Sequence, residues 1–144
     1  MPDVGQAAKQ FIDALNAHDE TRIREGYAEN VVFEAPGGIR MEGRDAATEY
    51  AMSFVRAFPD VRLAVANQVE GGDWVAFEIT FEGTHQDTLE APAGAIPATN
   101  RRITGKGAEF IRIEDGKVAE EHLYFDQVEF LTQLGVMEQE AATA

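Results

Sequence analysis

The spacing of the hydrophobic residues changes halfway along the chain, and this change limits the possible folds more than any other feature. Up to about Phe58, apolar side chains recur every three or four positions, as in Phe11 and Leu15, which is typical of amphipathic helices. Beyond that point they alternate with polar side chains, as in Phe77 and Ile79, which is typical of strands with one buried face. Helices followed by long antiparallel strands predict an α+β fold, in which one curved sheet wraps over the helices and leaves a cavity between them.

The same patterns place the individual elements. We expect helices at 4–15, 19–27 and 44–57, strands at 31–35, 61–70, 73–85, 101–113 and 118–126, and a last helical segment closed by Gly135. Asp3, Asp19 and Asp126 are candidate N-cap residues of the first, second and last helix. Gly71-Gly72 is expected to form a two-residue hairpin turn, and residues 86–100 a long loop. We expect a single domain over residues 1–135, followed by a frayed tail at 136–144.

Composition excludes several classes of function. The chain has 144 residues and a net charge of −14, so phosphate backbones and anionic lipid surfaces are unfavourable partners and we expect neither nucleic-acid nor membrane binding. It has no cysteine, which excludes disulfides and zinc–thiolate sites, and its three histidines lie too far apart to suggest a metal site. No apolar run approaches the length of a membrane span, and we expect a cytoplasmic protein.

Three motifs in the second half of the chain carry a resemblance. They are Gly83-Thr84-His85, the hairpin segment from Arg112 to Val118, and Tyr124-Phe125-Asp126. With the order of elements, they make residues from about Val4 to Gly135 similar to the SnoaL-like polyketide cyclases of the nuclear transport factor two-like superfamily. The resemblance implies a conical α+β barrel with a ligand pocket, often a homodimer. It also implies a cofactor-free reaction in which a carboxylate on the last strand and a histidine on the preceding strand move protons to close a ring.

The catalytic positions that the resemblance implies are changed in this chain. The family's aspartate position on the last strand falls on Leu123, its histidine position on the preceding strand on Glu109, and its asparagine position on the first strand on Phe33. Only the Gly-x-His histidine is retained, as His85. Leucine cannot transfer a proton, so an enzyme built on this sequence needs a proton carrier at another position.

The turn of the last hairpin decides which side chains face each other. A type I turn with Gly116 in a left-handed bulge places Glu109 opposite Glu121, and we favour this form. A two-residue turn instead places Glu109 opposite His122. In the favoured form Glu109 and Glu121 share the inner face with Leu123, while Val118 lies on the outer face. Two opposed carboxyl groups in an apolar environment would have raised pKa values, so that one stays protonated near neutral pH.

These features predict an enzyme without a cofactor that performs acid–base chemistry on a small apolar carbonyl, ester or epoxide compound. Glu109 would carry the proton and Glu121 would tune its pKa. The alternation along 73–85 predicts that His85 points into the cavity near its mouth, where it would hold or polarise the substrate. His85 could instead simply bond to the adjacent loop. The expected pocket residues are Leu15, Phe33, Tyr50, Phe54, Leu123 and Phe125.

Two other classes of function remain open at this point. The apolar replacements Phe33 and Leu123 favour a non-catalytic protein that binds a small molecule. A scaffold whose sheet face serves dimerisation is the third possibility.

Overall fold

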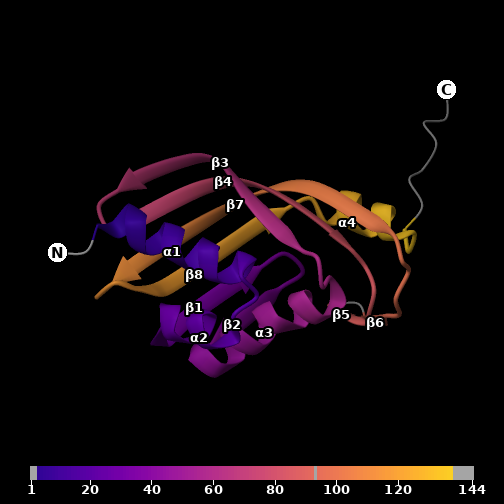
Figure 1. The fold of residues 1–144 in the computed structure, drawn as a ribbon, viewed down its shortest axis with the longest axis horizontal. Helices are drawn as coiled ribbons and strands as arrows, with labels where there is room; N and C mark the ends of the chain where they lie inside the picture. Colours follow the sequence, from indigo (N-terminus) through magenta and orange to yellow (C-terminus); the bar gives the residue numbers. More distant parts are fainter. Residues whose placement is uncertain (1–2, 93, 138–144) are drawn as a thin grey trace.

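The part of the protein that the structure describes has the predicted α+β architecture, with a curved sheet of six strands that does not close into a barrel and four helices (Figure 1). The computed structural model describes residues 3–92 and 94–137. Its helices are α1 (Val4–Asn16), α2 (Glu20–Gly26), α3 (Arg44–Ala57) and α4 (Gln127–Leu134). Its strands are β1 (Tyr27–Ala35), β2 (Ile39–Glu42), β3 (Arg62–Gly71), β4 (Trp74–Thr84), β5 (Leu89–Ala91), β6 (Gly94–Ile96), β7 (Arg102–Glu114) and β8 (Lys117–Phe125).

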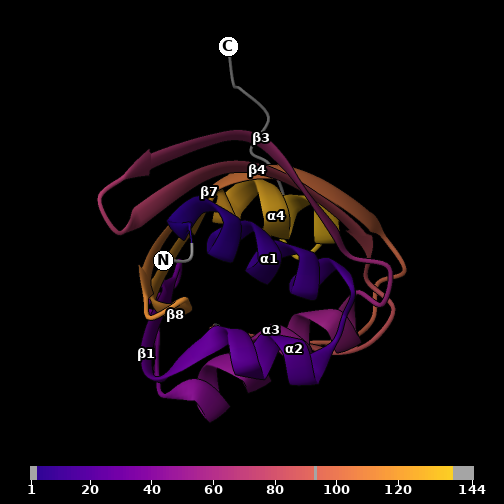
Figure 2. The ribbon, with the colours of Figure 1, turned by 60° about the vertical axis from the view of Figure 1, so that its left-hand side comes forward.

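The large sheet is mixed rather than purely antiparallel. Its strand order is β2-β1-β8-β7-β4-β3, and the one parallel pair joins β1 to β8. Figure 2 shows the long strands β3 and β4 curving over α1, while α2 and α3 lie on the other side of α1. This curvature gives the sheet a concave face that the helices cover, which is where an internal cavity can form.

Side-chain caps define where the helices begin. Asp3, Asp19 and Asp126 are the N-cap residues of α1, α2 and α4, and each carboxylate accepts a hydrogen bond from a backbone N–H of the first turn. Helix α4 ends at Gly135, whose φ of 80° is the left-handed conformation that glycine adopts at low cost. The sequence predictions of these three starts and of this end are confirmed.

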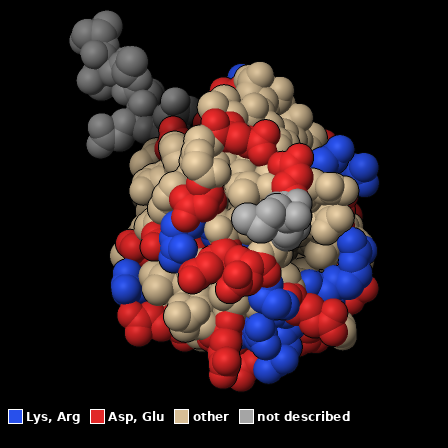
Figure 3. Space-filling model, turned by 90° about the vertical axis from the view of Figure 1, so that its left-hand side faces the viewer, with Lys and Arg blue, Asp and Glu red and all other residues tan. Residues whose placement is uncertain are grey.

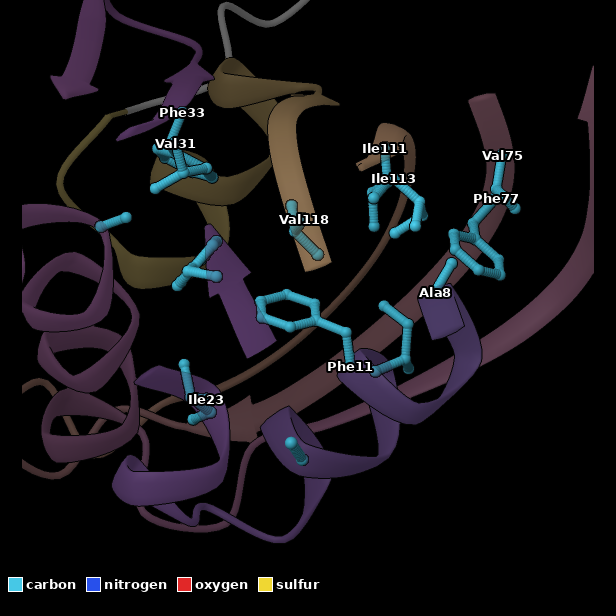
Figure 4. Packing of buried hydrophobic residues seen from close by; sticks show 14 of the residues in the cluster. Ala8, Phe11, Ile23, Val31, Phe33, Val75, Phe77, Ile111, Ile113 and Val118 are labelled. Carbon is cyan, nitrogen blue, oxygen red and sulfur yellow. The ribbon is translucent and has the colours of Figure 1, made fainter. Parts of the chain in front are cut away.

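The main core lies between α1 and the concave face of the sheet (Figure 4). Ala8 and Phe11 of α1 lie against strand residues that include Val75 and Phe77, and Phe11 meets the ring of Tyr27 edge-on at a centroid distance of 4.7 Å. A second, smaller cluster lies at the other end of the sheet and contains Ala57, Phe58, Leu89, Ile103, Phe130 and Leu134. The space between these two clusters is where the candidate site lies.

Several details of the predicted elements are wrong, among them the absence of a strand at β2. Gly71 pairs with Trp74, so the turn residues of the β3–β4 hairpin are Gly72 and Asp73 rather than Gly71 and Gly72. Residues 86–100 contain the small hairpin of β5 and β6, whose Leu89 is buried in the second cluster. Strand β1 begins at Tyr27, which the helical periodicity had placed at the end of the second helix.

The remaining structural predictions concern the ends of the chain and membranes. Residues 138–144 of the predicted tail lie outside the described residues, whereas Val136 and Met137 are exposed. Among the described helices, none combines the length and the apolar character needed to span a bilayer.

Candidate functional site

The β7–β8 hairpin decides which carboxyl groups enter the interior. Asp115 and Gly116 both have positive φ, 52° and 75°, and form a two-residue turn of the kind that joins twisted strands. One extra residue, Ala119, then interrupts the pairing on β8, so that Glu109 lies opposite Leu123. Both predicted partners of Glu109, Glu121 and His122, are therefore wrong, because the bulge lies two residues beyond the turn instead of within it.

The bulge nevertheless keeps the two predicted glutamates on one face. Glu121 pairs with Ile111, so Glu109 and Glu121 are diagonal neighbours on adjacent strands, and Phe33 of β1 lies beside Glu121. The prediction that Val118 faces outward is wrong: it is buried in the main core, because the extra residue Ala119 reverses the alternation before Glu120.

Glu109 and Glu121 form a buried pair of carboxyl groups. Their residues are 4% and 2% exposed, and each carboxyl group affects the pKa of the other. Burial raises the pKa of Glu109 well above its usual value, and the neighbouring Glu121 charge raises it further. Burial also raises the pKa of Glu121, although hydrogen bonds from Glu109 and Tyr27 oppose this shift. The pair therefore retains a proton at pH values where an exposed glutamate is fully ionised.

Tyr27 is the third member of this buried cluster. Its hydroxyl donates to Oε1 of Glu121 at 2.7 Å, and the pKa of Tyr27 is raised well above its usual value by burial and by the Glu121 charge. Tyr27 stands at the start of β1, where its carbonyl accepts a hydrogen bond from the Arg44 guanidinium. Sequence reasoning missed this role because it placed Tyr27 on a helix. Tyr27, Val31 and Phe33 are the buried positions of β1, but the exposed Glu29 interrupts their alternation, so the strand period alone did not reveal Tyr27.

A cavity of about 140 Å³ lies beside the glutamate pair, between the sheet and helices α1 and α3. Its wall is mostly aliphatic and aromatic, and its polar side chains are those of Asn16, Tyr27, Tyr50, Glu109 and Glu121. The structure places all six predicted pocket residues in this wall, namely Leu15, Phe33, Tyr50, Phe54, Leu123 and Phe125. Their contact with a ligand stays a prediction.

His85 is buried, but it does not line this cavity. Its ring stacks on Phe58 at a centroid distance of 5.2 Å, and Nδ1 is 3.0 Å from Oγ1 of Thr99 in the neighbouring loop. Burial lowers the pKa of His85, which favours the neutral ring. The cavity wall contains Phe58, which His85 contacts, but not His85. The expectation that His85 itself points into the cavity is therefore wrong. A role in polarising a substrate stays untested.

Two polar groups of the site can meet a ligand, namely Oε2 of Glu109 and the hydroxyl of Tyr50. Oε2 of Glu109 is buried and lacks a hydrogen-bond partner among residues 3–92 and 94–137. The Tyr50 hydroxyl lies in the cavity wall, and burial together with the Glu121 charge raises the pKa of Tyr50 to about 12, so this hydroxyl stays a donor at neutral pH. The Asn16 amide, in contrast, is committed to the backbone of Leu63 through both its nitrogen and its oxygen.

Metal ligands do not gather at this site or elsewhere in the part of the chain that the structure describes. No three side chains of His, Cys, Asp or Glu are close enough together there to hold an ion. The predicted absence of a cofactor stays a prediction. The chemistry that the described residues themselves offer is proton transfer by the carboxyl pair and hydrogen bonding by Tyr50.

The model of the SnoaL-like polyketide cyclase family matches residues 5–134. The chain belongs to this family. The SnoaL-like chain is also 35% identical over 66 residues to aklanonic acid methyl ester cyclase DnrD of Streptomyces peucetius, a match that covers 46% of this chain and 43% of DnrD. The match thus spans less than half of the curated relative's length.

Solved structures show the same fold as this SnoaL-like protein. IdmH from Streptomyces antibioticus is 26% identical with a TM-score of 0.77, and the match covers 94% of this chain and all of that one (100%). An LEH-like epoxide hydrolase of M. tuberculosis is 17% identical with a TM-score of 0.71, over 91% of this chain and 88% of its own. Proteins with different described reactions therefore share this architecture, and the reaction has to be argued from the site.

Proposed function

We propose that this SnoaL-like protein is an enzyme that works without a cofactor and moves protons on a small, largely apolar carbonyl, ester or epoxide compound. The observation that carries this proposal is the buried Glu109–Glu121 pair in the wall of an apolar cavity, with one oxygen of Glu109 unpartnered. Buried carboxyl groups whose pKa values are pushed apart are the arrangement by which enzymes obtain an acid and a base near neutral pH.

The hydrogen bonds assign different tasks to the two glutamates. Glu121 accepts from Tyr27 and from Glu109, so the negative charge of the pair rests on Glu121 and the shared proton on Glu109. When Oε2 of Glu109 takes a proton from a carbon next to a carbonyl, the shared proton passes to Glu121. The C–H bonding pair then becomes the enolate, and returning the proton to carbon or oxygen restores the pair. Tyr50 donates a hydrogen bond to the substrate oxygen as charge develops there.

The size of the cavity restricts the part of the substrate that is enclosed. An engineered apolar cavity of about 150 Å³ holds one benzene molecule. A cavity of about 140 Å³ therefore encloses roughly one ring with its carbonyl or epoxide group. The names of the relatives support an ester and an epoxide as substrate classes. DnrD is described as a methyl ester cyclase, and the M. tuberculosis neighbour as an epoxide hydrolase.

Proton abstraction can be tested before the natural substrate is known. Cyclic ketones of one ring, dissolved in D₂O, exchange their α-protons for deuterium when a base removes them, and NMR follows the rate. We expect exchange faster than in buffer alone with the wild-type protein, and loss of that acceleration in Glu109→Gln. A panel of one-ring esters and epoxides, followed by NMR for turnover, extends the test. Wild-type rates equal to buffer across the whole panel contradict the proposal.

A non-catalytic binding protein is the second candidate. Leu123 supports it, because this residue lies in the cavity wall opposite Glu109, where the family resemblance places an aspartate. Ligands that raise the melting temperature of the protein but are recovered unchanged after long incubation would favour this candidate over the enzyme.

We further propose that the protein forms a homodimer through the outer face of the sheet. Phe110 and Tyr124 lie there, 43% and 57% exposed, with their rings in edge-on contact. Two exposed aromatic side chains on adjacent strands are typical of a covered surface. Light scattering on the purified protein tests this proposal, and a mass of one chain at micromolar concentration contradicts it.

A further inference from the structure

The cavity contains negative charge without a positive side chain to balance it. Glu109 and Glu121 are both in its wall, whereas none of the lysine, arginine or histidine residues that the structure describes lines it. The neighbouring His122 lies on the opposite face of the sheet, where it contacts Glu120 at 3.2 Å and lies 3.8 Å from Glu34. A buried carboxylate that lacks a counter-charge is costly, so the site favours a ligand that supplies one.

The hydrogen-bonding groups of the cavity specify where such a ligand would attach. Oε1 of Glu121 is satisfied by Tyr27, and the Asn16 amide is satisfied by Leu63. Oε2 of Glu109, in contrast, is an unpartnered acceptor on a residue that is only 4% exposed. A ligand with a single N–H donor, directed at this oxygen, would satisfy the one unpartnered buried acceptor among the described residues that line the cavity.

The rest of the wall suits a cation that carries alkyl groups. The rings of Phe33 and Tyr50 are 5.0 Å apart, those of Tyr50 and Phe54 are 5.4 Å apart, and Phe58 continues the row. Aromatic faces attract cations, most strongly where water is excluded. Alkyl groups on the nitrogen would also gain the hydrophobic contact that this wall offers.

From these observations we infer that the cavity binds a small tertiary amine in its protonated form, about the size of one six-membered ring. The N–H of the ammonium ion donates to Oε2 of Glu109, and its alkyl groups pack against Phe33, Tyr50 and Phe54. A binding site for an amine goes beyond the proposed reaction. It does not depend on that reaction, because binding needs only the negative charge of the Glu109–Glu121 pair. The acidic surface, on which Asp and Glu outnumber Lys and Arg, also attracts cations over a distance (Figure 3).

Binding of an ammonium ion is coupled to the protonation of the glutamate pair. The titratable groups around the pair are Tyr27 on β1, Tyr50 on α3 and His122 on β8. The two tyrosines stay neutral, since their pKa values are raised, to about 12 for Tyr50. In the singly ionised pair the shared proton can move to Glu121 while the ammonium ion binds to Glu109; where both carboxyl groups are protonated, below the raised pKa of Glu121, the ligand must displace a proton from the pair. The affinity for an amine therefore rises with pH, by up to about tenfold per pH unit.

The experiment uses three one-ring probes on the full-length protein, namely 1-methylpiperidine, its uncharged carbon analogue methylcyclohexane, and cyclohexanone. NMR titration gives affinities from pH 5 to pH 8, and calorimetry in two buffers of different ionisation enthalpy counts the protons released. We expect 1-methylpiperidine to bind at least about tenfold more tightly than methylcyclohexane at pH 8, a difference of about 1.4 kcal/mol. We also expect amine binding to strengthen with pH and to release protons.

A matched pair of variants completes the test. Glu109→Gln keeps the shape and removes the carboxylate that faces the ligand, leaving charge only on Glu121, which Tyr27 already contacts; it should weaken amine binding at least about tenfold and shift its pH dependence, while cyclohexanone affinity changes less than about threefold. Glu120→Gln removes a charge from the outer face and should leave amine binding unchanged. Equal affinities for the amine and methylcyclohexane in the wild-type protein, or amine affinity independent of pH, would overturn the inference whether or not the variants fold. Neither result bears on the deuterium exchange that tests the proposed reaction.

Discussion

Glu120 and Glu121 are neighbours on β8, yet the two faces of the sheet give them opposite chemistry. Glu120 lies on the outer face, where it is hydrogen-bonded to His122 and Arg112, and these contacts lower its pKa. Glu121 lies on the inner face, 2% exposed, and burial raises its pKa. One peptide unit therefore separates an ordinary surface carboxylate from half of a buried acid–base pair.

This comparison teaches that the surroundings of a carboxyl group decide its function, not its residue type or its position in the chain. On the outer face water and cations stabilise the charged form. On the inner face the stabilising groups are the hydroxyl of Tyr27 and the partner Glu109. The predictions below test whether the two faces differ as strongly as the structure indicates.

The largest effect is expected from Glu109→Gln on the rate of proton transfer. Glutamine preserves the volume but cannot take or release a proton, so the α-proton exchange of a bound ketone should fall by about 10²- to 10⁴-fold. Exchange followed by NMR in D₂O measures this rate, with circular dichroism as the check on folding. An exchange rate in the folded variant equal to that of the wild-type protein would mean that the inner face is no more reactive than the outer one.

Tyr27→Phe should have the next largest effect. Among the described side chains, Tyr27 and Glu109 donate hydrogen bonds to the charged Glu121, and this substitution removes the bond from Tyr27. A hydrogen bond to a charged group contributes about 1.5–3 kcal/mol to stability. We expect the free energy of unfolding in urea to fall by about that amount at neutral pH. A merely structural tyrosine would change stability alone, whereas here the pH profile of exchange should also move to higher pH. A profile at the wild-type position would remove Tyr27 from the proton-carrying unit.

The free energy of unfolding depends on pH with opposite sign for the two faces, because the pKa of Glu109 on the inner face is raised and that of Glu120 on the outer face is lowered. In the folded protein the pKa of Glu109 is raised above its usual value of about 4.5, so the folded state holds more protons than the unfolded chain. The contribution of Glu109 is fully present below that value and is lost as the pH rises toward the folded-state pKa. Its slope reaches at most about 1.4 kcal/mol per pH unit.

The difference in unfolding free energy between the wild-type protein and Glu109→Gln, measured in urea at several pH values from 4 to 8, isolates this slope. The glutamine variant should lose less stability than the wild-type protein as the pH rises. A constant difference across this range would show that Glu109 titrates like an exposed glutamate.

The fold could be predicted from the sequence because hydrophobic periodicity reports which face of an element is buried. The change from helical to alternating spacing placed α1, α3 and the strands β3, β4, β7 and β8, and aspartate caps placed the helix starts. The short β2 and the β5–β6 hairpin were missed. Elements of three or four residues are too short to show a period, and their pairing depends on contacts with distant segments.

The site could be predicted only in part, because the pairing register of β7 and β8 depends on one bulge. Alternation correctly placed Glu109, Glu121 and Leu123 on the same face. The bulge itself falls on Ala119, a small residue that has no glycine-type backbone signature, and it was expected in the turn instead. The roles of Glu109 and Glu121 stay predictions.

Tyr27 and His85 show a second reason why sequence reasoning fell short. Each lies at the boundary of an element, where the local period no longer tells which neighbour a side chain meets. Tyr27 belongs to β1 instead of the preceding helix and reaches Glu121, which is 94 residues away in the sequence. His85 follows the last residue of β4 and is buried against Phe58, outside the cavity wall. Contacts of this kind are set by tertiary packing.

The smallest effect is expected from Glu120→Gln, which removes a carboxylate one residue away from the buried pair. Its side chain is 33% exposed and its partners are Arg112 and His122, so the lost ion pairs should cost about 0.2–1 kcal/mol, less in high salt. Proton exchange and its pH profile should match the wild-type protein. Urea unfolding at low and high salt, together with the exchange assay, measures both. A change in exchange as large as that of Glu109→Gln would show that charge on the outer face controls the cavity, and the contrast between the two faces would then fail.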